Sequence, residues 1–177
     1  MAAGNALELE LLPNYSSIPE FVETAPTFGE NAAGKAIYYS RQTEHVVFAD
    51  DSGLAVDALG GAPGVLSARY VGPGASNEQK IAKLLKELRG KKEVERAARF
   101  VCVIAVALRG RASVIVSGQA EGQILEGCRG NGGFGYDPVF YFPLLGKTFA
   151  ELTAEEKNVH SHRGKAFRRM MEVLEQG

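Results

Sequence analysis

The sequence has almost no surplus of charge of either sign. Lys and Arg number 20 and Asp and Glu number 21, which gives a formal net charge of −1 at pH 7. A chain with so little net charge creates no strong overall field of the kind that attracts nucleic acids or membrane surfaces. We therefore expect neither a nucleic-acid polymer nor a membrane as a partner, and a phosphate-bearing ligand has to be recognised by a local site.

Cysteine is scarce, and long apolar runs are missing. Cys102 and Cys128 show no Cys-x-x-Cys or Cys/His spacing that would predict a zinc site, and we interpret them as free thiols in a reducing compartment. No run of about 18 apolar residues predicts a membrane-spanning helix, and no basic and apolar segment predicts secretion. These features together predict a cytoplasmic protein.

The chain does have enough apolar residues for a core. The chain has 177 residues, of which 45% are apolar. This length predicts a single domain that spans residues 1–177, or a single domain of two small lobes, rather than two independent units.

The pattern of polar and apolar residues predicts both strands and helices. Alternating acids and leucines predict a strand over residues 7–12, and an apolar run over 45–50 predicts a buried strand that ends at two carboxylates. Capping sequences predict helix starts at Thr27, Ser76 and Thr153. We also expect a loop region over 53–74, a helix from 76 to about 90, an antiparallel hairpin of strands 100–108 and 112–125, and a closing helix over 164–175. This combination predicts an α/β fold with a mixed sheet.

The most informative segment is Phe-Ala-Asp-Asp-Ser-Gly-Leu at residues 48–54. Because neighbouring residues of an extended chain point to opposite faces, Asp50 and Asp51 cannot both face one ligand. We expect one acid to brace the turn and the other to face a site, where one or two carboxylates suffice to bind Mg²⁺ beside a phosphate. The same residues also make an ordinary polar turn, so the segment alone leaves both interpretations open.

Three further features can serve a phosphate or a base. In residues 130–138, Phe134 lies among glycines and can stack on a base, although a Gly-rich hairpin with aromatics in the core fits the composition equally well. In residues 157–163, cations and donors can meet a phosphate or a purine carbonyl, or can complement the dipole of a helix end. Lys35 can supply a compact cation for a phosphoryl group if it faces Asp51.

In their order and spacing, these segments resemble the inosine triphosphate pyrophosphatase family, also called the Ham1 family. The resemblance extends from about residue 7 to the C-terminus and rests on residues 23–36 (Glu-Thr-x-x-Thr-Phe-x-Glu-Asn-Ala-x-x-Lys-Ala), 50–54 (Asp-Asp-Ser-Gly-Leu), 61–70 (Gly-Ala-Pro-Gly-Val-x-Ser-Ala-Arg-Tyr), 132–138 (Gly-Gly-Phe-Gly-Tyr-Asp-Pro) and 161–163 (Ser-His-Arg).

The resemblance implies a two-lobed α/β fold of the Maf/Ham1 type, built around a long mixed β-sheet with flanking helices. It further implies a homodimer, and a cleft between the lobes that binds Mg²⁺ and a purine nucleoside triphosphate. The implied reaction is hydrolysis of deaminated purine nucleotides (ITP, dITP and XTP) to the monophosphate and pyrophosphate, which removes them from nucleotide pools.

The resemblance also assigns roles to individual residues. Asp51 matches the general base and, together with Glu23, the metal-binding acids, whereas Lys35 matches the phosphate-facing lysine. The residues that match substrate-binding positions are Ser52, the base-stacking loop Phe134, Gly135, Tyr136 and Asp137, and the group Lys157, His162 and Arg163 that recognises a 6-oxo purine. Donors in that last group would favour a carbonyl over the amino group of adenine, which is a strong form of discrimination, and the His162 and Arg163 pair argues against a modified pyrimidine as the substrate.

The chain departs from this family near its start. Members have a Ser/Thr-Gly-Asn-x-x-Lys loop between a first strand and a helix, and this loop binds the triphosphate. Here Ala3-Gly4-Asn5 runs directly into the leucines of residues 7–11, with no lysine in reach. We therefore expect about fifteen to twenty residues of helix, and the strand before them, to be absent. The alternative function is a nucleotide-binding protein whose catalysis is impaired.

Overall fold

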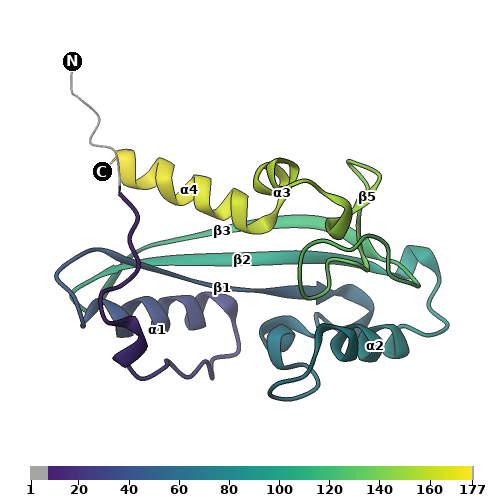
Figure 1. Ribbon diagram of the computed structural model, residues 1–177, viewed down its shortest axis with the longest axis horizontal. Helices are drawn as coiled ribbons and strands as arrows, with labels where there is room; N and C mark the ends of the chain where they lie inside the picture. Colours follow the sequence, from purple (N-terminus) through teal and green to yellow (C-terminus); the bar gives the residue numbers. More distant parts are fainter. Residues whose placement is uncertain (1–7, 177) are drawn as a thin grey trace.

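The computed structural model describes residues 8–176, in which a curled five-stranded sheet has helices on both faces (Figure 1). The strands, in spatial order, are β1 Val47–Val56, β2 Ala97–Leu108, β3 Arg111–Ile124, β4 Phe140–Phe142 and β5 Lys147–Thr148. The helices are α1 Phe28–Ser40, α2 Asn77–Glu87, α3 Ala154–His160 and α4 His162–Gln176. Short 3-10 turns are η1 Tyr15–Ser17, η2 Asp57–Leu59, η3 Gly64–Arg69, η4 Glu93–Glu95 and η5 Phe149–Glu151. The predicted α/β class is confirmed.

The strand predicted over residues 7–12 is not formed in its described part. Residues 8–12 join no ladder, and Leu9 and Leu11 are 55% and 93% exposed; Leu7, like Ala3-Gly4-Asn5, lies outside the described residues. An alternating pattern becomes a strand only where a neighbouring strand takes up its backbone groups. Every strand pairing within residues 8–176 is antiparallel, so the predicted mixture of parallel and antiparallel pairing is also wrong for this part of the chain.

Strand β1 is longer than predicted, because it does not end at the two carboxylates. It pairs with β2 without interruption from Val47 opposite Ala107 to Val56 opposite Ala98. This ladder keeps the polar residues 50–53 extended, although their composition also fits a turn. The interpretation of this segment as a turn is therefore wrong.

Helices α1 and α4 pack on opposite faces of the long strands, α1 below the sheet and α4 above it in Figure 1. On one face, Ala32 and Ala36 of α1 pack against Ala49 of β1. On the other face, Met170 of α4 packs with Ile104 of β2. Because side chains alternate along a strand, the odd-numbered residues 49 and 51 face α1 and the even-numbered residues 50 and 52 face α4.

The predicted helix starts are confirmed. Thr27, Ser76 and Thr153 each accept a hydrogen bond from the backbone N–H three residues later. The closing helix begins at His162, two residues earlier than predicted, because the Ser161 hydroxyl accepts the N–H of Gly164 at 3.1 Å. None of the helices found within residues 8–176 combines the length and the apolar character needed to cross a bilayer.

The predicted hairpin is also confirmed, with β2 and β3 joined by a two-residue turn. Arg109 and Gly110 both have positive φ, of 49° and 78°, which is the geometry that matches the twist of paired strands.

Candidate active site

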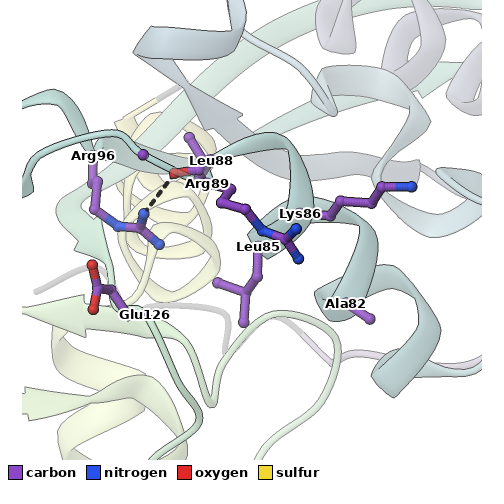
Figure 2. Close-up of a pocket in the computed structure, with 8 residues that line it drawn as sticks. Ala82, Leu85, Lys86, Leu88, Arg89, Arg96 and Glu126 are labelled. Atoms are coloured by element: carbon purple, nitrogen blue, oxygen red, sulfur yellow. Dashed lines mark hydrogen bonds between the residues drawn. The ribbon is translucent and has the colours of Figure 1, made fainter.

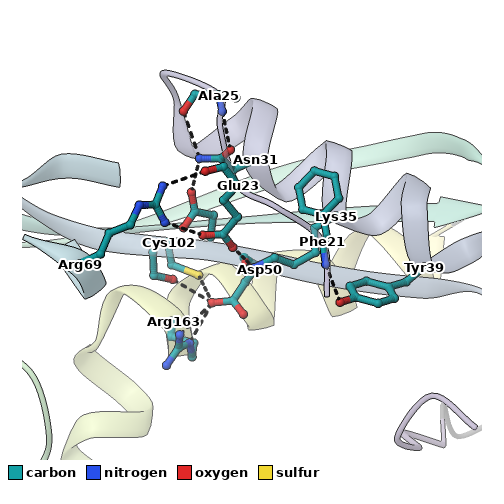
Figure 3. A network of polar contacts seen from close by, with 12 residues as sticks. Phe21, Glu23, Ala25, Asn31, Lys35, Tyr39, Asp50, Arg69, Cys102 and Arg163 are labelled. Atoms are coloured by element: carbon teal, nitrogen blue, oxygen red, sulfur yellow. Dashed lines mark hydrogen bonds and ion pairs between the residues drawn. The ribbon is translucent and has the colours of Figure 1, made fainter. Parts of the chain in front are cut away.

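Asp50 and Asp51 lie at the centres of two polar clusters on opposite faces of β1. Figure 3 shows Asp50 beside Arg163 and Cys102, and Glu23 and Asn31 on the other side of the strand. Asp51 is 7% exposed, faces α1 and accepts a hydrogen bond from Asn31 Nδ2 at 3.0 Å. Asp50 faces α4, where Nε and Nη2 of Arg163 donate to its Oδ2 at 3.1 and 2.9 Å. The prediction that the two acids cannot face one ligand together is confirmed, and the candidate site has two halves that meet at residues 50–52.

The first half, which we call the Asp51 cluster, consists of Glu23, Asn31, Lys35, Asp51 and Arg69. Lys35 Nζ donates to the backbone carbonyl of Asp50 at 3.1 Å and forms an ion pair with the Glu23 carboxylate. Arg69 Nη2 donates to the backbone carbonyl of Glu23 at 2.8 Å, and its Nη1 lies 3.6 Å from the Glu23 carboxylate. Lys35 therefore faces the acids, as its predicted role requires.

Arg69 was not among the predicted site residues. Its one signal in the sequence is its place in the segment 61–70, and only η3 brings it to Glu23. It fixes the Pro-containing connection that precedes α1, and so it fixes the Glu23 carboxylate.

The pKa of the Asp51 carboxyl group is raised above its ordinary value. Burial raises its pKa and the Glu23 charge raises it further, whereas the hydrogen bond from Asn31 lowers it, and the net shift is upward. Two carboxylates that repel each other fit a hard divalent cation, which prefers oxygen ligands and needs only one or two of them from the protein. Glu23 and Asp51 are the residues that would bind such a cation. Within residues 8–176, no three His, Cys, Asp or Glu side chains gather as a complete metal cage.

The second half, which we call the Asp50 cluster, consists of Asp50, Ser52, Cys102 and Arg163. Ser52 Oγ donates to Asp50 Oδ2 at 2.8 Å, and the Cys102 thiol lies 3.8 Å from the same oxygen. Burial by itself would raise the pKa of Asp50, but the Arg163 charge and the hydrogen bonds from Ser52 and Arg163 outweigh it, so the pKa is lowered. Asp50 is thus an ionised acceptor, and Cys102, whose pKa burial raises to about 11, is a neutral thiol.

The aromatic loop presents one ring beside this cluster. Phe134 is 60% exposed, with Lys157 Nζ 4.9 Å and Arg163 Cζ 6.0 Å from its ring centroid. The backbone N–H of Phe134 donates to the buried Asp137 carboxylate at 2.9 Å, and Lys157 forms an ion pair with the same carboxylate. The Asp137 carboxylate therefore binds groups of the protein itself and holds both the Phe134 backbone and the Lys157 side chain in place.

Tyr136 and Gly135 belong to the same loop but present no side chain to the ring. Tyr136 is buried in the core, and its hydroxyl donates to the Ser67 carbonyl at 3.0 Å. Gly135 has φ of 61°, a backbone conformation that suits glycine and turns the chain between Phe134 and Tyr136. The structure thus brings together Phe134, Lys157, His162 and Arg163, and uses Tyr136 as an anchor.

His162 is buried as a neutral ring. Its imidazole is 7% exposed and stacks on Phe100, with ring centroids 4.8 Å apart and planes 12° apart. Burial lowers its pKa to about 3, and the charges of Arg163 and Lys157 act in the same direction. Its Nδ1 is buried and has no hydrogen-bond partner among the residues described. A buried polar atom without a partner is uncommon, and binding sites are one place where it occurs.

The low pKa of His162 predicts how the stability of the protein depends on pH. The unfolded chain takes up this proton below the ordinary value of 6.5, and the folded chain only near pH 3. Stability is therefore complete above about pH 6.5 and falls towards pH 3, by at most about 1.4 kcal/mol per pH unit. The free energy of unfolding is measured with urea at pH 7 and at pH 5. We expect the fall between these two pH values to be about 2 kcal/mol smaller in His162→Gln than in the unchanged chain. Identical losses in the two proteins would contradict the neutral buried ring.

Two hollows in the surface lie away from these clusters. One of about 320 Å³ lies between α2 and the end of β3 (Figure 2), where buried Arg96 donates to the carbonyls of Ile124, Leu88 and Leu125 at 2.6, 3.0 and 2.9 Å. This guanidinium ties the end of α2 to β3, which is a structural role. A second cavity of about 530 Å³ lies between β3 and α4. Neither cavity is lined by a predicted site residue.

Comparisons with known proteins point to one family. The sequence model of the Ham1 family matches residues 1–173 of the chain. The dITP/XTP pyrophosphatase of Geobacillus kaustophilus is 51% identical over 174 residues, which cover 98% of this chain and 85% of that protein. The dITP/XTP pyrophosphatase of Shouchella clausii is 47% identical over 164 residues, which cover 93% of this chain and 83% of that protein. Among solved structures, the HAM1 protein of Coxiella burnetii has a TM-score of 0.86 at 43% identity, and covers 91% of this chain and 83% of its own.

Proposed function

Because the chain belongs to the Ham1 family, we propose that it is a nucleoside-triphosphate pyrophosphatase that hydrolyses non-standard purine nucleotides such as dITP, XTP and ITP to the monophosphate and pyrophosphate. The names of its relatives support this activity. The main structural support is that Asp51, Glu23 and Lys35 gather on one face of β1, and that an exposed aromatic ring with donors lies beside Asp50 on the other. The first set suits a triphosphate and the second suits a purine base.

In the Asp51 cluster, Asp51 is the proposed general base. Its pKa is raised towards neutral pH, and the hydrogen bond from Asn31 Nδ2 orients its carboxylate. Asp51 accepts a proton from water while the water oxygen bonds to the α-phosphorus, and the bond to the bridging oxygen breaks so that pyrophosphate leaves. Lys35 places a fixed cation beside this charge.

Glu23 and Asp51 are the proposed Mg²⁺ ligands. When bound there, Mg²⁺ would neutralise phosphate charge and orient the attacking water. Lys35 and Arg69 hold the Glu23 side chain and backbone in place for this role.

In the Asp50 cluster and the aromatic loop, the base is recognised. Phe134 offers an exposed ring, and stacking on such a ring contributes about 1 to 3 kcal/mol per base. Lys157 and Arg163 flank the ring as donors, and neutral His162 has one buried nitrogen still to be paired. A 6-carbonyl can accept from such donors, whereas the 6-amino group of adenine is itself a donor and would leave them unpaired when the bound base covers them, which is costly.

The homodimer and the cytoplasmic location implied by the family resemblance are also part of this proposal. The first predicts a molecular mass in solution of twice 19.0 kDa, measured by light scattering, and the second predicts recovery in the soluble cytoplasmic fraction of cells.

The proposal is tested by the release of pyrophosphate from equal concentrations of dITP, XTP, ITP and dATP with Mg²⁺. We expect release from the first three to be on the order of 100-fold faster or more than release from dATP, and addition of EDTA to abolish it. Release of single phosphate in place of pyrophosphate would overturn the proposed reaction. If a folded sample binds ITP but releases nothing, the alternative of a nucleotide-binding protein with impaired catalysis is correct.

A further inference from the structure

One carboxylate oxygen near the base-recognition residues has three nitrogen and oxygen donors, besides the thiol of Cys102. Asp50 Oδ2 accepts from Arg163 Nε, Arg163 Nη2 and Ser52 Oγ at 3.1, 2.9 and 2.8 Å. Arg163 lies on α4 and Ser52 on β1, far apart in the sequence, and both are expected to contact the substrate. Asp50 itself has no such expected role, so its concentration of hydrogen bonds calls for an explanation.

We propose that Asp50 is a positioning residue, which holds the Arg163 guanidinium in the orientation that recognises the purine base. This inference rests on the proposed function and extends it, because it names what determines the base specificity of Arg163.

The first argument is the mobility that Arg163 would otherwise have. Its side chain is 51% exposed and projects from the first turn of α4. A long exposed side chain samples many rotamers, and ordering it costs conformational entropy. Two N–H groups donating to a single carboxylate oxygen fix the plane of the guanidinium as well as its position.

The second argument is that Asp50 is itself held in place. It lies in the middle of β1 opposite Ile104 of β2, so its backbone is part of an uninterrupted ladder. Ser52 donates to its carboxylate from the same face of the strand, and the buried Cys102 lies on the neighbouring strand. A site built on paired strands is more precise than a site built on loops.

The third argument is the position of the one Arg163 donor group that does not bind Asp50. Its Cζ lies 6.0 Å from the centroid of the exposed Phe134 ring, where a stacked base would lie. Its Nε and Nη2 donate to Asp50, and among the hydrogen bonds of residues 8–176 none uses Nη1. The ion pair therefore sets where the remaining donor lies relative to the ring.

The variant Asp50→Asn tests this role, because it keeps the shape of the side chain and removes its charge. We expect the ratio of kcat/KM for dITP over dATP to fall about tenfold, through a higher KM for dITP with little change in kcat. Asp57→Asn is the matched control, because Asp57 forms a comparably exposed ion pair with Arg99 outside the site, at 2.8 and 3.0 Å. The control is expected to keep the ratio within twofold.

A double variant separates positioning from a general structural role. Arg163→Ala is expected to lower the same ratio, and adding Asp50→Asn to it should lower the ratio no further, because the two residues act through one group. A purely structural Asp50 would instead lower the melting temperature and reduce kcat/KM for dITP and dATP equally, which would overturn the proposal. If Asp50→Asn does not fold, Asp50→Glu, which displaces the carboxylate by one methylene, is expected to lower the ratio in the same way.

The failure of this inference can be distinguished from the failure of the proposed function. If the unchanged chain prefers dITP and folded Asp50→Asn keeps that preference, Asp50 does not position Arg163, and the proposed function stands. If the unchanged chain releases no pyrophosphate, calorimetric binding of inosine and adenosine monophosphates replaces the assay. A preference for inosine monophosphate that Asp50→Asn loses and Asp57→Asn keeps would then support the positioning role, and any other result would overturn it.

Discussion

Replacing Asp51 with Asn is expected to lower the rate of pyrophosphate release by about a thousandfold while leaving nucleotide binding within about threefold of its original strength. The amide has nearly the same shape and can still accept the hydrogen bond that Asn31 donates to Asp51. It cannot accept a proton from water, and it is a weaker ligand for a hard cation than a carboxylate. The loss should therefore appear in kcat, measured as pyrophosphate release from dITP.

Binding has to be measured separately in this variant, by calorimetry with ITP. Asp57→Asn serves again as a control, since Asp57 is exposed just beyond the end of β1 and pairs with Arg99. We expect it to retain normal turnover. Turnover by Asp51→Asn within tenfold of the unchanged chain would show that Asp51 is not the base.

The second large effect is expected for Gly118→Ala, far from any reacting atom. Gly118 lies on β3 under the first turns of α4, where a Cβ would lie 2.2 Å from the carbonyl oxygen of His162 and 2.5 Å from the backbone nitrogen of Ala166. Both are backbone atoms, so α4 has to move as a whole. We expect a loss of about 2 kcal/mol, or about 4 to 8 °C in melting temperature, measured by thermal unfolding.

This shift should also reach the site, because α4 begins with His162 and Arg163. The preference for dITP over dATP is therefore expected to fall in Gly118→Ala. Gly127→Ala is the matched control: no atom lies within 4 Å of its Cβ position, and its φ is not positive. Its stability should stay within about 0.5 kcal/mol of the unchanged chain. Equal melting temperatures for the two variants would refute the close packing of α4 on β3.

Local sequence was sufficient wherever the interactions are themselves local. Thr27, Ser76 and Thr153 each cap a helix through a contact three residues away, and Arg109-Gly110 forms a turn within its own hairpin. These elements could be predicted because the residues that decide them lie within one window of sequence. The order and spacing of the motifs also sufficed to identify the family, because each motif is a continuous stretch.

Long-range pairing decided the elements that were predicted wrongly. Residues 8–12 alternate as a strand does, but within residues 8–176 no strand pairs with them. Residues 50–53 have the composition of a turn, yet β2, about fifty residues later, holds them extended. An alternating or polar pattern states what a segment can form, and the neighbouring segment determines which possibility is realised.

For the candidate site, the sequence by itself determined which residue types are present: two adjacent acids, a lysine on the first helix, an aromatic in a glycine-rich loop, and a His-Arg pair. Only the tertiary structure decided how they are used. It directs Asp51 to Asn31 and Asp50 to Arg163, 113 residues away, and it turns Tyr136 into the core. The physical reason is that hydrogen bonds and burial depend on distance in space, and a pleated strand places neighbours in sequence on opposite faces while folding brings distant residues into contact.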